Sequence, residues 1–183
     1  MEMQGPQTVP RGGAPIAAAP LVVLAIDPGS IVTGYGVVRA TGMEISLLTS
    51  GALRPKGRAI ASRLTELYDG VRALVEEWRP HEVAIEEPFS RVNARSAFVL
   101  GKAQAAAILA AAHAGLPVYE YTPAAVKQAV TSYGRSDKAQ VQEMVRLQFG
   151  LAAPPQPTDA ADALAVALCH LAHRRTAALV GDT

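Results

Sequence analysis

Residues 21–40 read LVVLAIDPGSIVTGYGVVRA, and this stretch decides the fold. Leu21 to Asp27 is a short, continuous apolar run that ends on an acid, which is the pattern of a strand buried on both faces. The residues PGS then form a turn, and Thr33 to Ala40 is predicted to be a second strand. Because a third predicted strand, Glu44 to Leu53, follows after a short link, the chain is expected to open with a β-meander.

Helices and strands alternate after the meander. Apolar residues recur at steps of three and four from Ile60 to Trp78, which predicts a helix that Arg79-Pro80 ends. Further strands are expected at Glu82–Glu86 and Leu116–Tyr121, and further helices at Ala94 to about His113, from Thr122-Pro123, from Ser136 and from a cap at Thr158 or Asp159. This order predicts an α/β fold in which helices flank a mixed, five-stranded sheet.

The bulk composition suits one globular domain. The chain has 183 residues, of which 50% are hydrophobic and 18% charged, enough to build a sizeable core. We expect a disordered tail over residues 1–20, which are rich in glycine and proline, one domain over 21–175 and a flexible C-terminus over 176–183. Cys169 is the only cysteine, so it is expected to be a buried thiol, and neither a disulfide nor a zinc site is expected. No membrane segment is expected, which favours a cytoplasmic protein.

Four acids stand out by position. Asp27 and Glu86 each end a predicted buried strand, and Asp159 and Asp162 lie three residues apart at the start of the last helix, where they share a face. A carboxylate at a buried strand end is costly unless a positive charge pairs with it. Converging carboxylates would suit Mg²⁺ or Mn²⁺, and two such ions can promote phosphodiester hydrolysis.

Three of these acids also have a specific structural explanation. Asp27 can start the turn that follows it, Asp159 can cap a helix, and Asp162 can favour the helix dipole. Taken singly, Asp159 and Asp162 are better explained by these structural roles. For Asp27 and Glu86, the sequence alone does not decide between a structural and a catalytic role.

Four segments resemble, in order and spacing, the signature segments of RuvC-type crossover junction endodeoxyribonucleases. They read IDPGSIVTGYGVV, VAIEEPF, YTPAAVKQAVTSYGRSDKAQVQEMV and DAADALAVALCH. The match runs from about Leu21 to His170. The resemblance implies an RNase H-like fold whose catalytic, metal-binding carboxylates are Asp27, Glu86, Asp159 and Asp162. Some family members have histidine at the third of these sites, where this chain keeps aspartate.

The resemblance also implies a reaction and partners. It implies a homodimer that resolves four-way (Holliday) junction DNA in recombination and repair by paired symmetric cuts, with a branch-migration helicase complex as a partner. Two Mg²⁺ ions per subunit, which Mn²⁺ can replace, would activate the attacking water. A C2 dimer would match the approximate two-fold symmetry of a junction, and the alanine-rich helix at 94–113 would allow close approach to a sheet or to a second subunit.

Positive charge is concentrated where DNA would bind, although the net charge of the whole chain is only +1. Residues 88–150 carry seven basic and three acidic side chains, which favours contact with phosphates. By the resemblance, Lys127 and Lys138 match two lysines of the family, of which one lies near the active site and one on the DNA-binding face. The remaining candidates for DNA contact are Phe89, Arg91, Arg95 and Arg135. Phe89 is expected either to wedge between bases or to pack in the protein. Relatives often carry more aromatic residues in this loop, where this chain has Ser90 and Val92.

Three other functions compete with junction cutting. An actin-like phosphate-binding domain has a similar first hairpin but needs a second large domain. An inactive nucleic-acid-binding module would not need all four acids. An RNase H-like ribonuclease that processes ribosomal RNA would not be expected to carry the basic segment Thr122 to Val145.

Overall fold

The computed structural model describes residues 19–181, apart from residue 30 and the segments 89–93 and 132–136. Phe89, Arg91 and Arg135 therefore lie outside the described residues. Arg95 lies in a described helix, but its side chain is outside the description. The DNA contacts expected of these four residues stay predictions.

Five strands form one mixed sheet in the order β3-β2-β1-β4-β5. The pairs β1–β2 and β2–β3 are antiparallel, and the pairs β1–β4 and β4–β5 are parallel. The strands are β1 (Leu21–Asp27), β2 (Thr33–Thr41), β3 (Glu44–Leu53), β4 (Glu82–Glu86) and β5 (Val118–Tyr121). The helices are α1 (Ile60–Trp78), α2 (Ala94–His113), α3 (Pro123–Thr131), α4 (Lys138–Gln148) and α5 (Thr158–Gly181). The predicted mixed, five-stranded sheet is confirmed.

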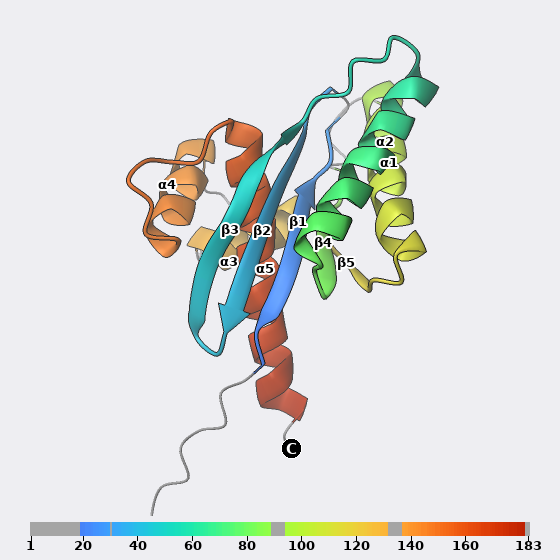
Figure 1. Ribbon diagram of the computed structural model, residues 1–183. Helices are drawn as coiled ribbons and strands as arrows, with labels where there is room; N and C mark the ends of the chain where they lie inside the picture. Colours follow the sequence, from blue (N-terminus) through green and yellow to red (C-terminus); the bar gives the residue numbers. More distant parts are fainter. Residues whose placement is uncertain (1–18, 30, 89–93, 132–136, 182–183) are drawn as a thin grey trace, which may run out of the picture.

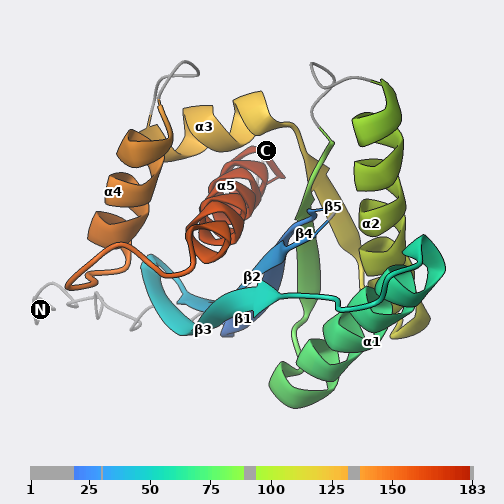
Figure 2. The ribbon, with the colours of Figure 1, turned by 90° about the horizontal axis from the view of Figure 1, so that it is seen from above.

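The helices cover the two faces of the sheet as separate groups, with α1 and α2 on one face and α3, α4 and α5 on the other (Figures 1 and 2). Successive strand residues point to opposite faces. In β1, Leu24 and Ile26 therefore pack with α1 and α2, whereas Val23 and Ala25 pack with α5. This double burial explains why β1 is apolar almost throughout.

Two helix boundaries differ from the sequence prediction. Asp137, rather than Ser136, caps α4, and its carboxylate accepts a hydrogen bond from the Gln140 backbone N–H at 2.8 Å. Both residue types cap helices well, so composition could not choose between them. Helix α5 begins at Thr158 and continues to Gly181, beyond the expected domain end at residue 175.

Helix α2 contains a segment, Ser96–His113, that is long and apolar enough to span a membrane by length and composition. Only 33% of this segment is buried inside the protein. Its inner face packs small residues against β1, β4 and α1, including Ala103, Ala107 and Ala110. A core-helix face explains only the buried part of this composition, and Phe98 and Leu109 on the outer face are exposed.

A buried polar network ties α5 to β4 and β5. The fully buried His170 lies 2.7 Å from Glu82 through Nε2, and Tyr121 lies 2.8 Å from its Nδ1. Arg174 adds an ion pair to Glu82 at 3.2 Å. Burial lowers the pKa of His170, although the hydrogen bond to Glu82 opposes this. The network fixes α5 against the parallel strands β4 and β5.

Candidate active site

Strand register places Asp27 and Glu86 side by side. In the parallel β1–β4 pair Ile26 is opposite Ile85, so the next residues, Asp27 and Glu86, end neighbouring strands at one edge of the sheet. Ala25 and Ala84, two residues before them, face α5. Because side chains alternate along a strand, both carboxylates also point to the α5 side.

Two glycines on β2 let α5 approach this edge. A Cβ atom at Gly34 would lie 2.6 Å from the carbonyl carbon of Asp159, and one at Gly36 would lie 2.6 Å from Leu164 Cδ2. Contacts this short do not occur in folded proteins, so position 34 needs glycine for α5 to lie where it does. Since Gly34 is paired with Asp27 across the β1–β2 ladder, the first turn of α5 meets the end of β1.

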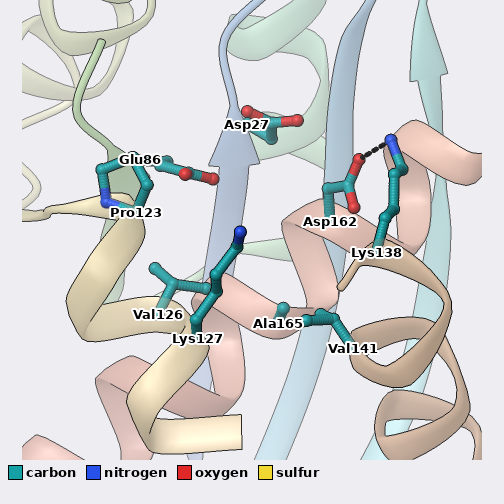
Figure 3. Close-up of a pocket in the computed structure, with 9 residues that line it drawn as sticks. All are labelled: Asp27, Glu86, Pro123, Val126, Lys127, Lys138, Val141, Asp162 and Ala165. Carbon is teal, nitrogen blue, oxygen red and sulfur yellow. Dashed lines mark hydrogen bonds and ion pairs between the residues drawn. The ribbon is translucent and has the colours of Figure 1, made fainter. Parts of the chain in front are cut away.

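Asp27, Glu86 and Asp162 consequently line one pocket of about 250 Å³. Figure 3 shows the three carboxylates around the same opening, with Lys127 from α3 and Lys138 from α4 extending into it. Asp159 does not line the pocket, but it is close enough for its charge to raise the pKa of Asp27. Three of the four predicted acids therefore share a pocket, and the fourth lies beside it.

Burial and mutual repulsion make the strand-end carboxylates hard to ionise. Burial, followed by the charges of Asp162 and Asp159, raises the pKa of Asp27 to about 7. Burial, followed by the charges of Asp27 and Asp162, raises the pKa of Glu86 to about 8. Among the described residues, neither carboxylate has a hydrogen-bond or ion-pair partner. The charges of Lys127 and Lys138 oppose these shifts without reversing them, and no described residue pairs directly with Asp27 or Glu86.

One of the two lysines that line the pocket pairs with Asp162 rather than with a strand-end acid. Lys138 Nζ lies 2.7 Å from Asp162 Oδ2, and this hydrogen bond raises the pKa of Lys138. Lys127 lines the pocket and lowers the pKa of Glu86 through its charge. Lys138, which was predicted to contact DNA, thus lies within the acid pocket.

The residues present fit hard divalent cations. The pocket offers carboxylate oxygens, which Mg²⁺ and Mn²⁺ prefer, and its half-buried strand-end acids, Asp27 and Glu86, have no ion-pair partner among the described residues. As placed in the described part of the chain, no three His, Cys, Asp or Glu residues lie close enough together to hold an ion. The repulsion between the acids and the pairing of Asp162 with Lys138 both favour this spread arrangement.

Two structural features of the site were not predicted from the sequence. Gly34 and Gly36 were assigned to a strand without a role in placing α5, although glycines inside a strand often mark a close approach of another segment.

Cys169 behaves as predicted: it is buried, and burial raises the pKa of its thiol to about 11.

A meander followed by parallel strands, with acids ending the two central strands, defines a protein of the RNase H-like fold with a carboxylate pocket. Solved structures agree with this class. The chain is similar to Thermus thermophilus RuvC, with a TM-score of 0.78 and 36% identity over 85% of this chain and 96% of that chain. It is also similar to T. thermophilus RuvC in complex with Holliday junction substrate, with a TM-score of 0.77, 35% identity and the same coverage of both chains.

The chain belongs to the RuvC family of crossover junction endodeoxyribonucleases, whose family model matches residues 23–170. A crossover junction endodeoxyribonuclease RuvC from Dehalococcoides mccartyi is 51% identical over 83% of this chain and 93% of its own length. One of the same description from Rubrobacter xylanophilus is 50% identical over 86% of this chain and 89% of its own length. The predicted resemblance is therefore confirmed.

Proposed function

We propose that this protein is a divalent-metal-dependent endonuclease that resolves four-way DNA junctions by cutting two strands symmetrically. The observation that carries the proposal is the pocket in which Asp27, Glu86 and Asp162 meet at the active-site edge of an RNase H-like sheet. Membership of the RuvC family and the similarity to a RuvC bound to junction DNA support the choice of substrate.

The four acids are proposed to hold two Mg²⁺ ions, which Mn²⁺ can replace. When bound, such ions stabilise the charge that develops on the scissile phosphate and make water a better nucleophile. Asp27 and Glu86, on the rigid strand ends, would fix one side of the cage, and Asp162 and Asp159 would close it from α5. If Asp162 held an ion, it would give up its contact with Lys138, and Lys138 Nζ would then be available to a DNA phosphate.

DNA would lie across the pocket along α3 and α4. Lys127 and Lys138 open onto the pocket from these helices, where they can attract the phosphate backbone. Phe89, Arg91, Arg95 and Arg135 remain proposed contacts, with Phe89 as the candidate wedge at the junction centre.

A homodimer is proposed to supply two equivalent active sites for the paired cuts. Helix α2 carries exposed apolar residues, Phe98 and Leu109, beside the small residues Gly101 and Ala105. This outer face suits close packing against a second copy. A cytoplasmic location and coupling to a branch-migration helicase complex complete the proposal.

The test is incubation of the protein with labelled four-way, nicked and linear DNA and with RNA, each with and without Mg²⁺ and without ATP. We expect paired symmetric cuts in the four-way junction only when Mg²⁺ is present. Cutting of RNA in preference to the junction would support a ribonuclease instead. Binding without cutting in both Mg²⁺ and Mn²⁺ would indicate a binding module.

A further inference from the structure

A second group of basic side chains lies between β3 and α1, outside the basic region already described. Residues 54–65 contain Arg54, Lys56, Arg58 and Arg63 and no acid. Arg54, Lys56 and Arg58 are exposed, while Pro55 and Gly57 between them are half-buried. These three exposed cations at alternate positions are called the basic strip here.

Strand register places the basic strip at the edge of the sheet that carries the acids. Asp27 is paired with Gly34 on β2, and Thr33 on β2 is paired with Leu53, the last residue of β3. Neighbouring strands lie about 4.8 Å apart, so the end of β3 lies roughly 10 Å from the end of β1. The strip follows directly after Leu53.

The strip and the pocket lysines lie on opposite sides of that edge. Seen from above in Figure 2, the chain leaves β3 toward α1, whereas α3 and α4 lie across the sheet beyond α5. Lys127 and Lys138 come from those two helices. A duplex that crosses the acid pocket would therefore meet positive charge on both sides.

The side chains of the strip are available to a ligand, whereas its backbone is anchored. The Lys56 backbone N–H donates a hydrogen bond to Glu66 Oε2 on α1 at 2.6 Å. Within the described part of the chain, none of the three strip side chains forms an ion pair. A solvated surface usually mixes both signs of charge, whereas residues 54–65 contain no acid and the Glu66 carboxylate contacts the backbone of the strip rather than its side chains.

We propose that Arg54, Lys56 and Arg58 bind the backbone phosphates of a junction arm, on the side of the active site away from α3 and α4. This inference rests on the proposed function, since it assigns a second phosphate-binding surface to the same substrate. The contact would position the arm without reading its sequence, because phosphates carry no base information.

The first experiment measures how the affinity for a four-way junction depends on salt. The strip variant carries Arg54→Gln, Lys56→Gln and Arg58→Gln, and the matched control carries Arg39→Gln, Arg72→Gln and Arg79→Gln, which lose the same charge away from the acid-bearing edge. Each lost phosphate contact lowers the slope of log affinity against log salt by about 0.9. We expect the strip variant to lose about 2 to 3 from this slope, and the control to keep the wild-type slope.

Equal slopes for the strip variant and the wild-type protein would overturn the proposal. Unfolding temperatures identify a variant that fails to fold, in which case Lys56→Gln alone is used, with an expected loss of about 0.9 in slope. Failure of the wild-type protein to cut junctions would overturn the proposed function instead, so the two failures are distinguishable.

A second experiment tests proximity directly. Because Cys169 is buried, a thiol-reactive photo-crosslinker will label a single introduced cysteine. We expect Lys56→Cys to crosslink to a junction arm and Arg39→Cys, at the other end of β2, not to do so. Absence of crosslinks from Lys56→Cys in a protein that binds the junction with wild-type affinity would count against the strip.

Discussion

At Asp27, the proposed catalytic role and the stability of the folded protein make opposite demands on the side chain. Its pKa rises to about 7 because the carboxylate is buried among other acids. A carboxylate whose pKa is raised on folding stabilises the fold fully only below its unfolded pKa, about 3.9, and this stability is lost as the pH rises through the folded value. An acid kept in such a place costs stability at neutral pH, which is expected where function requires it.

We predict that Asp27→Asn abolishes junction cutting and leaves junction binding largely intact. An amide keeps the size of the side chain but removes the charge that would hold a cation. Cutting rates and binding affinities for the same labelled junction check this prediction. Normal cutting by the variant would show that Asp27 holds no catalytic ion.

The same substitution is predicted to stabilise the metal-free protein at pH 8, by about 1–3 kcal/mol. This corresponds to a rise of roughly 2–10 °C in Tm for a chain of this size. The difference should shrink as the pH falls toward 5, because Asp27 then takes up a proton in the folded protein. Thermal unfolding in EDTA at both pH values gives the measurement, and an equal or lower Tm for the variant at pH 8 would be the contrary result.

At the scale of elements, the site depends on how closely α5 crosses β2. Position 34 faces the backbone of Asp159, which cannot move without the helix, whereas position 36 faces the end of the flexible Leu164 side chain. Substituting each glycine in turn therefore distinguishes a displacement of the start of α5 from a general loss of packing.

We predict that Gly34→Ala lowers the cutting rate at least about 100-fold, because a displacement of about 1 Å at a catalytic group can have this effect. Gly36→Ala should stay within about tenfold of the wild-type rate, since Leu164 can adopt another rotamer. Rates measured alongside Mn²⁺ affinity check both, and the Mn²⁺ affinity should fall for Gly34→Ala alone. Equal losses in the two variants would mean that α5 placement has no special role.

The elements could be predicted from the sequence more fully than the site. Strands such as Leu21–Asp27 are marked by short apolar runs, and α1 by its apolar period and the Arg79-Pro80 stop. Convergence of the acids depends instead on the β1–β4 register and on the space that Gly34 leaves for α5, and neither is visible in spacing. The pair between Lys138 and Asp162 is likewise a tertiary contact between α4 and α5. The basic strip is visible as composition, but only the β2–β3 register places it at the active-site edge.

For the whole molecule, paired cuts require two active sites held in a fixed relation. The outer face of α2 is the proposed contact, and its Phe98 side chain is 73% exposed in the single chain. Exposed apolar side chains grouped on one helix face commonly mark an interaction surface.

We predict that the wild-type protein has the mass of two 19.1 kDa chains in solution, and that Phe98→Glu with Leu109→Glu makes it monomeric by burying charge in the interface. Each cut should then occur singly, giving nicked junctions. Light scattering after gel filtration measures the mass, with Met43→Glu as a control because Met43 is exposed at the β2–β3 turn. A dimeric double variant would place the interface elsewhere.

The most direct measurement is the anomalous diffraction of crystals grown with Mn²⁺. We predict one or two anomalous peaks in the pocket, with carboxylate oxygens of Asp27, Glu86 and Asp162 about 2.0–2.3 Å from an ion and Lys138 turned away from Asp162. Manganese absent from the pocket at saturating concentration, with Lys138 still paired to Asp162, would contradict the proposal that these acids form a nuclease site.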